Sequence, residues 1–193
     1  MRMDDIYGHI AIALERGKYN FTQKGIAASL GCSLSTVNHA IKPLVRIGAV
    51  VKRSRGFGVS NAKKFLTFWA VKRDIKVLYS TYYPESAEKI ESLMPSVIFT
   101  AYSGAKFYHK IAPSDYGEVY VYGDCNAVIR RFPRNNGRHN VFCLQMPRFL
   151  ENERIAPLTL IYVDLFNIPT WYATEFFRAV EAKLDELLER TSH

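Results

Sequence analysis

Apolar residues recur at helical spacing in three successive segments of the first fifty residues. Each segment stops at or just before a glycine, the residue that most readily ends a helix as its C-cap. The second and third segments also begin at a hydroxyl residue suited to an N-cap, Thr22 and Ser33. The pattern therefore predicts three helices, whose apolar faces are Ile6, Ile10, Ala13 and Leu14, then Ile26, Ala27 and Leu30, then Leu34, Val37, Ile41 and Leu44, and whose ends lie at Gly17, Gly31 and Gly48.

The third helix is expected to run from Ser33 to about Ile47, and only residues 31–33 separate it from the second helix. Two helices joined by such a short turn are typical of a helix-turn-helix. After Gly48 the apolar pattern changes from helical spacing to alternation. This change predicts a strand over 49–53, a glycine-rich turn over 54–58 and a short returning strand at 59–60.

Residues 22–60, together with the helix before them, resemble the winged helix-turn-helix of prokaryotic transcription regulators. The chain over 22–53 reads TQKGIAASLGCSLSTVNHAIKPLVRIGAVVKR. The turn, the apolar face of the third helix and the hairpin follow in the order and spacing of that family. The resemblance implies that residues 1–74 form a winged-helix DNA-binding domain. The pattern over 61–74 predicts a trailing amphipathic linker helix whose apolar residues are Phe65, Phe68, Trp69 and Val71.

The rest of the chain mixes helical and strand patterns, so we expect an α+β domain over residues 75–193. The segment 155–174 is poor in charge, but it contains Asp164, Asn167 and Pro169, and we therefore expect buried core there and no membrane span. The patterns predict helices over 84–93, 97–109 and 170–190, the last with Tyr172, Phe176, Val180, Leu184 and Leu187 on one face, and strands over 75–79, 118–122, 127–132 and 140–145.

The charge of the chain is concentrated in its first part. The formal net charge of +8 comes from 26 Lys and Arg against 18 Asp and Glu. Residues 1–74 hold 13 basic and 4 acidic residues, a net of +9, whereas residues 75–193 hold 13 and 14, a net of −1. A basic first domain suggests a polyanionic partner, and a nearly neutral second domain suggests dimerisation, sensing or partner binding.

The third helix is expected to present a polar face opposite its apolar one, and such a face suits the major groove of DNA. Asn38 has the amide geometry to pair with an adenine edge, and basic side chains suit phosphate oxygens. A polar helix face is also what any solvated helix presents, so both interpretations stay open. The candidate DNA-binding residues are Thr22, Lys24, Ser33, Ser35, Thr36, Asn38, His39, Lys42 and Arg46, with Lys52, Arg53 and Arg55 in the wing.

One residue departs from the helical pattern. Pro43 lies inside the expected recognition helix, where it removes a backbone donor. We therefore expect the helix to bend near residues 39–43, or to read DNA with its first two turns while the rest packs.

The cysteines and histidines give no sign of a metal or cofactor site. Cys32, Cys125 and Cys143 are widely spaced and form no CxxC pair, so we expect three free thiols and a cytoplasmic protein. The N-terminus carries no signal-peptide pattern, and the five histidines form no metal-binding motif. The arginines Arg130, Arg131, Arg134 and Arg138 fit either a second nucleic-acid patch or a solvated hairpin.

The second domain shows a resemblance to the nucleotidyltransferase fold, in which a Gly-Ser turn precedes a helix and a following strand presents two carboxylates. Here Ser103-Gly104 stands in reversed order, and the segment Asp115-Tyr116-Gly117-Glu118 has no carboxylate pair at the spacing i, i+2. Two-metal catalysis needs such a pair on one strand face. We therefore expect an inactive relative of that fold and not an enzyme.

A second resemblance lies in residues 158–184, LTLIYVDLFNIPTWYATEFFRAVEAKL, which look like the closing segment of AbiEi-type antitoxins of type IV toxin–antitoxin systems. The shared pattern is Tyr162, Asp164 and Leu165 before a short loop and a helix. The resemblance implies a winged helix followed by a degenerate nucleotidyltransferase-like domain, in a protein that represses its own promoter. The Gly-Arg-Gly-Glu-like run of that family is absent here. From its apolar neighbours we expect Asp164 to be a buried, hydrogen-bonded anchor.

The sequence thus favours a sequence-specific transcriptional regulator, a repressor of antitoxin-like type, that binds double-stranded DNA as a homodimer. A protein partner would bind through residues 75–193, and no membrane contact, cofactor or metal is expected. Two alternatives stay open. One is a nucleotidyltransferase-type enzyme that uses the winged helix to hold nucleic acid, and the other is an RNA-binding module.

Overall fold

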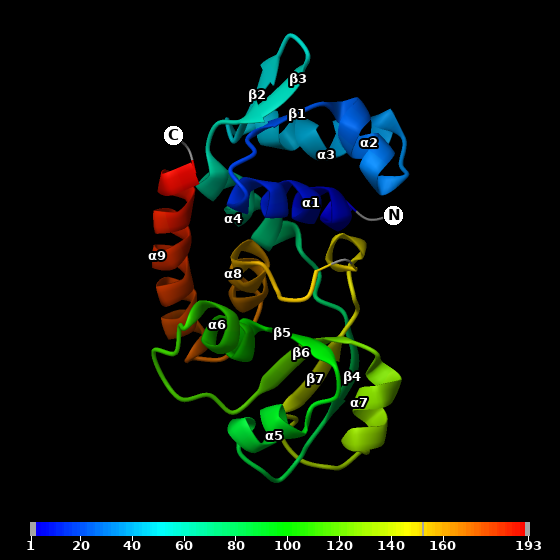
Figure 1. Ribbon diagram of the computed structural model, residues 1–193, viewed down its shortest axis with the longest axis vertical. Helices are drawn as coiled ribbons and strands as arrows, with labels where there is room; N and C mark the ends of the chain where they lie inside the picture. The colour runs from blue at the N-terminus through cyan, green and yellow to red at the C-terminus, as the bar shows by residue number, and fades with distance from the viewer. Residues whose placement is uncertain (1–2, 152, 192–193) are drawn as a thin grey trace. The chain divides into compact units, whose positions relative to one another are not determined.

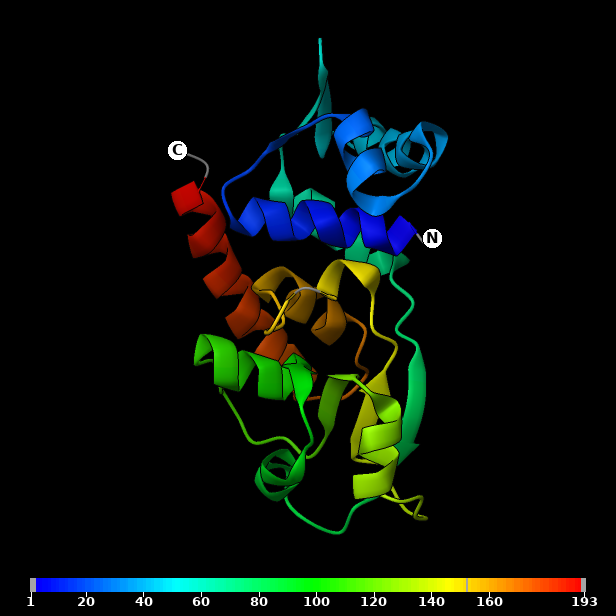
Figure 2. The same ribbon diagram turned by 45° about the vertical axis from the view of Figure 1, so that its right-hand side comes forward.

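The computed structural model describes residues 3–151 and 153–191, and its chain is an α+β protein (Figures 1 and 2). The chain divides into two compact units. The first comprises Met1–Arg73 with Ala182–His193, and the second comprises Asp74–Glu181. The division differs from the expected one at the C-terminus, because the last residues belong to the first unit.

The first unit contains the helices that the apolar pattern predicts. Thr22, Ser33 and Asn61 each cap the helix that follows by accepting a backbone N–H with the side chain. Gly31 ends the second helix in the left-handed conformation, with φ of 61°. This turn of residues 31–33 sets the second and third helices against each other. The helices are α1 (Met3–Glu15), α2 (Gln23–Leu30), α3 (Leu34–Arg46) and α4 (Ala62–Lys72).

A small antiparallel sheet accompanies these helices. The strands β2 (Val50–Arg53) and β3 (Gly56–Val59) form a hairpin, drawn in cyan in Figure 1, that projects beyond the helices. The strand β1 (Asn20–Phe21) pairs with β3, which gives the strand order β1-β3-β2. The hairpin confirms the expected first strand, but its turn is shorter than the expected 54–58, because the returning strand already begins at Gly56. The two-residue β1 is too short to leave a sequence pattern.

Tyr7 of α1 ties the core of the first unit together. Its hydroxyl donates to the carbonyl oxygen of Ala40 in α3, at 3.1 Å. Its ring packs edge-on against Phe65 and Phe68 of α4, with centroids 6.2 and 5.8 Å apart. Burial raises the pKa of Tyr7 to about 12. The side chains buried around it include Ile6, Ile10, Leu14, Val37, Ile41, Leu44, Phe65 and Trp69.

Three expectations for these helices need correction or refinement. Leu34 is 53% exposed, because it lies in the first turn of α3, where the core ends. Val71 is 64% exposed, since the buried positions of α4, Phe65, Leu66, Trp69 and Ala70, turn it away from the core. Helix α3 continues through Pro43 to Arg46, so the proline does not terminate it and the expected end near Ile47 is confirmed.

The second unit is built around a four-stranded sheet of order β4-β7-β6-β5. The strands β6 and β7 are parallel, and both outer pairs are antiparallel. Its elements are β4 (Val77–Thr81), α5 (Ala87–Leu93), β5 (Val97–Thr100), α6 (Ala101–His109), β6 (Val119–Gly123), α7 (Cys125–Arg131), β7 (Val141–Leu144), the short 3-10 helix η1 (Arg148–Leu150), α8 (Leu158–Phe166) and the first part of α9 (Ala173–Thr191), whose residues from Ala182 onward belong to the first unit.

Helices cover both faces of this sheet (Figures 1 and 2). Val119 and Val121 of β6 face one side, in a buried cluster with Ile90 of α5 and Val128 of α7. Tyr120 and Tyr122 alternate with them and face the other side. There Tyr120 packs against Tyr102 of α6, and Tyr122 donates to Asp164 of α8. The α+β expectation is thereby confirmed.

Two elements of this unit differ from the sequence predictions. Residues 127–132 were expected as a strand, but 127–131 belong to helix α7 and Phe132 is its C-cap. Asp124 caps the start of this helix by accepting from the backbone N–H of Asn126 at 2.9 Å. Residues 97–109, expected as one helix, form strand β5 and then α6. The strand ends at Thr100 and the helix begins at Ala101, where a φ of 49° turns the backbone between the two elements.

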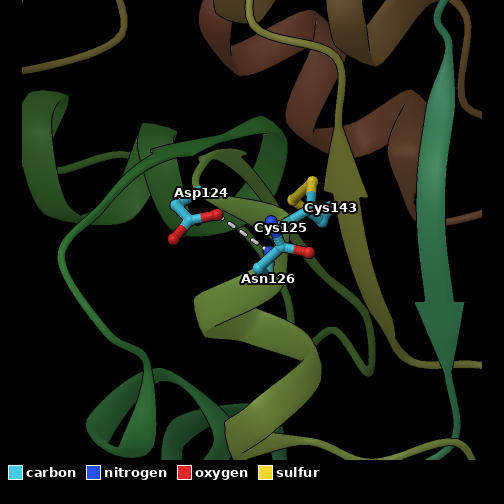
Figure 3. Close-up of a disulfide and its surroundings, with 4 residues drawn as sticks. All are labelled: Asp124, Cys125, Asn126 and Cys143. Atoms are coloured by element: carbon cyan, nitrogen blue, oxygen red, sulfur yellow. Dashed lines mark hydrogen bonds between the residues drawn. A yellow bond between two sulfur atoms is a disulfide. The ribbon is translucent and has the colours of Figure 1, made fainter.

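The cysteine prediction is wrong for two of the three residues. Cys125, in the first turn of α7, forms a disulfide with Cys143 of β7, and Figure 3 shows the bond between them. Their Cα atoms are 5.7 Å apart although 18 positions separate them in sequence, a closeness that only the packing of α7 on β7 creates. Cys32 is a free thiol. The disulfide removes these two cysteines from the argument for a reducing compartment.

The expectation of buried core over 155–174 is confirmed for α8, in which every residue from Leu158 to Leu165 is buried. It is wrong for Ile155, Phe166 and Trp171, which are exposed on either side of that stretch. Asp164 is fully buried, and one of its carboxyl oxygens accepts from Thr100 at 2.6 Å and from Tyr122 at 2.7 Å. It is therefore the hydrogen-bonded anchor that the sequence predicts. Within the described residues, no helix combines the length and apolarity that crossing a bilayer requires.

Candidate nucleic-acid interface

Helix α3 presents one polar face to solvent. Its buried side chains, Val37, Ala40, Ile41 and Leu44, all lie on the face that packs into the first unit. The opposite face carries side chains that hydrogen-bond or bear charge, at steps of three and four residues. They are Ser35, Asn38, His39, Lys42 and Arg46, and all five are exposed.

Three of the candidate residues serve as helix caps or partner a cap. Thr22 accepts from the backbone N–H of Gly25 at 3.0 Å, and Ser33 accepts from that of Thr36 at 3.1 Å. The hydroxyls of Ser33 and Thr36 also share a hydrogen bond of 2.8 Å. These bonds fix the start of α2 and of α3, so the three residues position the interface from its edges.

The β2–β3 hairpin carries three exposed cationic residues, Lys52 and Arg53 on β2 and Arg55 in the turn. Its position depends on Gly56, which has φ of 134° and lies directly against β1. A Cβ at this residue would stand 2.0 Å from the carbonyl oxygen of Phe21. Only glycine therefore lets the hairpin pack this closely on β1.

A hollow of about 430 Å³ lies between the hairpin and α2. It brings Arg53 and Arg55 next to Thr22, whereas the sequence had placed these residues only on separate elements. Burial and the nearby Lys18 ammonium lower the pKa of the His9 imidazole from its ordinary value. The hollow is also lined by polar residues that were not among the candidates, Lys18, Asn20 and Ser29, because a single polar residue leaves no pattern in the sequence.

The cations of this surface are not neutralised by acids in the part of the chain that the structure describes. Among the described residues, no aspartate or glutamate forms an ion pair with Lys24, Lys42, Arg46, Lys52, Arg53 or Arg55, which are all exposed. The first unit as the structure divides it holds 15 basic and 6 acidic residues, a net charge of +9, and the second unit holds 11 and 12. The charge excess therefore remains entirely with the first unit.

The arginines of the second unit are arranged differently. Arg138 lies 3.7 Å from a carboxyl oxygen of Glu118, and Arg130 lies 3.9 Å from one of Asp124. The Nε of Arg131 donates to the carbonyl oxygen of Leu93 at 3.1 Å. Arg134 is exposed, and among the described residues it forms no ion pair with an acid. Local acids thus offset part of this charge.

The residues that resemble a nucleotidyltransferase site lie apart or in the core. Ser103 is fully buried in α6 and donates to Glu91 at 2.7 Å. Glu118 lies just before β6, where it accepts from Tyr172, and Asp124 lies beyond the other end of that strand. In the described part of the chain, no three residues among histidine, cysteine, aspartate and glutamate gather as a metal site would require.

The candidate interface therefore consists of the exposed face of α3, the caps at its edges and the β2–β3 hairpin, and its cations have no acidic partner among residues 3–151 and 153–191. Among protein-family models, curated proteins and solved structures, none matches this chain, so the partner of the interface must be argued from its own geometry and charge.

Proposed function

We propose that the protein is a sequence-specific transcriptional regulator of the winged helix-turn-helix type, acting as a repressor on double-stranded DNA. One observation supports this proposal most strongly. A helix with a polar outer face and a basic hairpin lie in the same unit, and none of their cations is paired with an acid in the described residues. A surface of this kind attracts the phosphate backbone of nucleic acid.

In this proposal α3 enters the major groove, which is wide enough for a helix and displays a distinct donor and acceptor pattern for each base pair. Asn38 lies on the second turn of its exposed face, where an amide can pair with an adenine edge. Lys42 and Arg46 lie one and two turns further on, where they would contact phosphate oxygens.

The β2–β3 hairpin is proposed as the wing. Arg53 and Arg55 line the hollow next to the start of α2, where Thr22 holds the first turn in place. Helix N-termini and arginines both favour phosphate oxygens. These contacts would hold the domain on the duplex without selecting a sequence.

The second unit is proposed to bring two copies of the chain together and to bind a regulatory partner, in an antitoxin-like protein whose nucleotidyltransferase-like domain is degenerate. One recognition helix covers few base pairs, and dimeric regulators read two half-sites about one helical turn apart. Tyr162, Asp164 and Leu165 carry this resemblance. Asp164 is the buried residue of α8 that accepts hydrogen bonds from Thr100 and Tyr122.

The test is binding of the full chain to the duplex upstream of its own gene, measured by fluorescence anisotropy against a random duplex and a single-stranded RNA of equal length. We expect the upstream duplex to bind most tightly, and we expect affinity for all DNA to fall steeply with salt because cations are displaced from phosphates.

Tighter binding to the RNA than to either duplex would contradict the proposal in favour of an RNA-binding module. Incorporation of a labelled nucleotide in the presence of Mg²⁺, by a protein that ignores the upstream duplex, would contradict it in favour of the enzyme alternative.

A further inference from the structure

The first unit carries an elongated groove between the C-terminal part of α3 and the outer face of α4. Two adjoining hollows of about 720 and 500 Å³ form it, and both are lined by Ile47 and Phe68. Pro43 and Tyr7 line the first hollow and Val71 lines the second. We call this feature, defined by these five residues, the α3–α4 groove.

The floor of the α3–α4 groove is apolar and fixed in place. Tyr7 bonds to α3 through its hydroxyl and packs its ring on Phe68 of α4, so the two walls are joined from below. Ile47 is 42% exposed and Val71 is 64% exposed, which is unusual for large apolar side chains that lie next to one another. Apolar surface of this kind marks interaction sites in soluble proteins.

The rim of the groove is basic. Lys42, Arg46 and Lys72 line the first hollow, and Lys64 lines the second. Among the described residues none of these four is paired with an acid, whereas the acid of the groove, Asp4, already pairs with Arg73 at 2.5 Å. A ligand of the groove must therefore combine an apolar face with negative charge.

We propose that the α3–α4 groove binds an acidic amphipathic helix of a partner protein. A helix of this kind offers apolar residues along one face for Ile47, Phe68 and Val71, flanked by carboxylates for the lysines and the arginine of the rim. DNA would supply negative charge to the basic rim, but it offers no apolar surface to pack against the floor of the groove. A second copy of this surface would place like charges against each other across a two-fold axis.

A contact of the same chemistry is present within the first unit. The C-terminal part of α9 is an acidic helix with buried Leu184 and Leu188, and it contacts α4 through an ion pair of 2.9 Å between Asp185 and Lys63. Tyr19 also donates to the carbonyl oxygen of Leu188, at 3.1 Å. Lys63 also lines the second hollow of the groove, so an acidic amphipathic helix already contacts a residue beside its apolar floor.

Binding in this groove would regulate DNA binding, a consequence that rests on the proposed function. Lys42 and Arg46 belong both to the groove rim and to the exposed face of α3. A carboxylate partner that engages them would remove two phosphate contacts and would repel DNA. The partner and the duplex are therefore expected to exclude each other.

The test uses a fluorescein-labelled peptide with leucines on one helical face and glutamates elsewhere, and a control peptide of the same composition with the leucines scattered. Binding to the full chain is followed by anisotropy. We expect the amphipathic peptide to bind at least about tenfold more tightly, because only it can bury an apolar face.

Two neutral variants of exposed apolar residues locate the site. Val71→Asn should weaken the amphipathic peptide by about tenfold, whereas the matched variant Leu78→Asn, on β4 of the second unit, should leave its binding unchanged. Lys72→Gln removes a charge from the rim but no apolar surface, and it should also weaken binding of the amphipathic peptide. Unchanged melting temperatures would show that the variants remain folded. If Val71→Asn does not fold, peptide binding by Lys72→Gln decides the test.

Equal binding of the two peptides, or equal effects of Val71→Asn and Leu78→Asn, would overturn the proposal. A dimer of the wild-type chain that Val71→Asn dissociates would assign the groove to a second copy, and a loss of duplex binding in Val71→Asn would assign it to DNA. A chain that binds the peptide but no duplex would refute the proposed function alone. Duplex binding without peptide binding would refute the groove alone.

Discussion

Asn38 and Arg53 carry different parts of the proposed recognition, since one lies on the outer face of α3 and the other on the hairpin. We expect Asn38→Ala to lose discrimination at one base-pair position, worth about 1–3 kcal/mol. We expect Arg53→Ala to weaken all duplexes alike and to lower the salt dependence by about one counterion. Titration of single-base variants of the selected duplex, at two salt concentrations, measures both effects. If the two variants changed specificity and salt dependence to the same degree, the division of roles would be wrong.

Asp164 is expected to be essential for stability. The variant Asp164→Ala leaves the hydroxyls of Thr100 and Tyr122 without this buried acceptor, at a cost of about 1–3 kcal/mol for each. Urea denaturation followed by tryptophan fluorescence measures the loss, with the exposed Asp115→Ala as the matched control. Equal stability of the two variants would show that the carboxyl is dispensable.

Single residues also show where sequence reasoning succeeds and where it stops. The caps Thr22 and Ser33 and the buried Asp164 were predictable, because local spacing or an apolar neighbourhood determines their environment. The exposure of Leu34 and Val71 was not, because it depends on where the core ends and no periodicity records that. The clustering of Lys18 with Arg53 required the fold itself.

At the scale of elements, the disulfide is the feature that the sequence analysis missed most clearly. Residues 127–132 alternate well enough to suggest a strand, and only as helix α7 do they bring Cys125 to Cys143. The two-residue β1 was missed for a different reason, since its pairing with β3 decides its conformation. Long amphipathic helices, by contrast, were predictable because their own residues carry the pattern.

The disulfide is expected to stabilise the second unit. Replacing Cys125 and Cys143 by alanine should lower the free energy of unfolding by about 3 kcal/mol, the loop-closure contribution for a loop of this length. Denaturation of the double variant measures this loss, and Cys32→Ala serves as the control. Alkylation of the denatured but unreduced protein should label Cys32 alone. Labelling of all three cysteines would contradict the assignment.

The whole molecule buries several tyrosine hydroxyls, which makes its stability sensitive to alkaline pH. Burial raises the pKa of Tyr7 to about 12, and burial with the hydrogen bond to Glu118 does the same for Tyr172. An unfolded tyrosine ionises near pH 10 while the folded one stays neutral, so stability is complete below pH 10 and falls as the pH rises towards 12. Denaturation midpoints at pH 8, 10 and 11 measure this fall. A flat profile would show that the buried hydroxyls ionise without unfolding the chain.

At the scale of the whole molecule, the positive net charge is confined to one of the two units. The first unit carries a net charge of +9 and the second a net of −1, and this holds whether the boundary is drawn from the sequence or from the structure. Composition alone could predict the separation. The exposure of the cations and their lack of acidic partners within the described residues needed the structure, because both depend on side chains that are distant in sequence.

The most direct test of the central claim is selection of duplexes from a random library by the full chain, followed by Kd measurements on the selected and random duplexes at one salt concentration. We expect an enriched motif with two half-sites, and an affinity ratio of at least about a thousand over random duplex, as sequence-specific regulators show. Recovery of no common motif, with equal affinity for all duplexes, would contradict the claim that this surface reads DNA sequence.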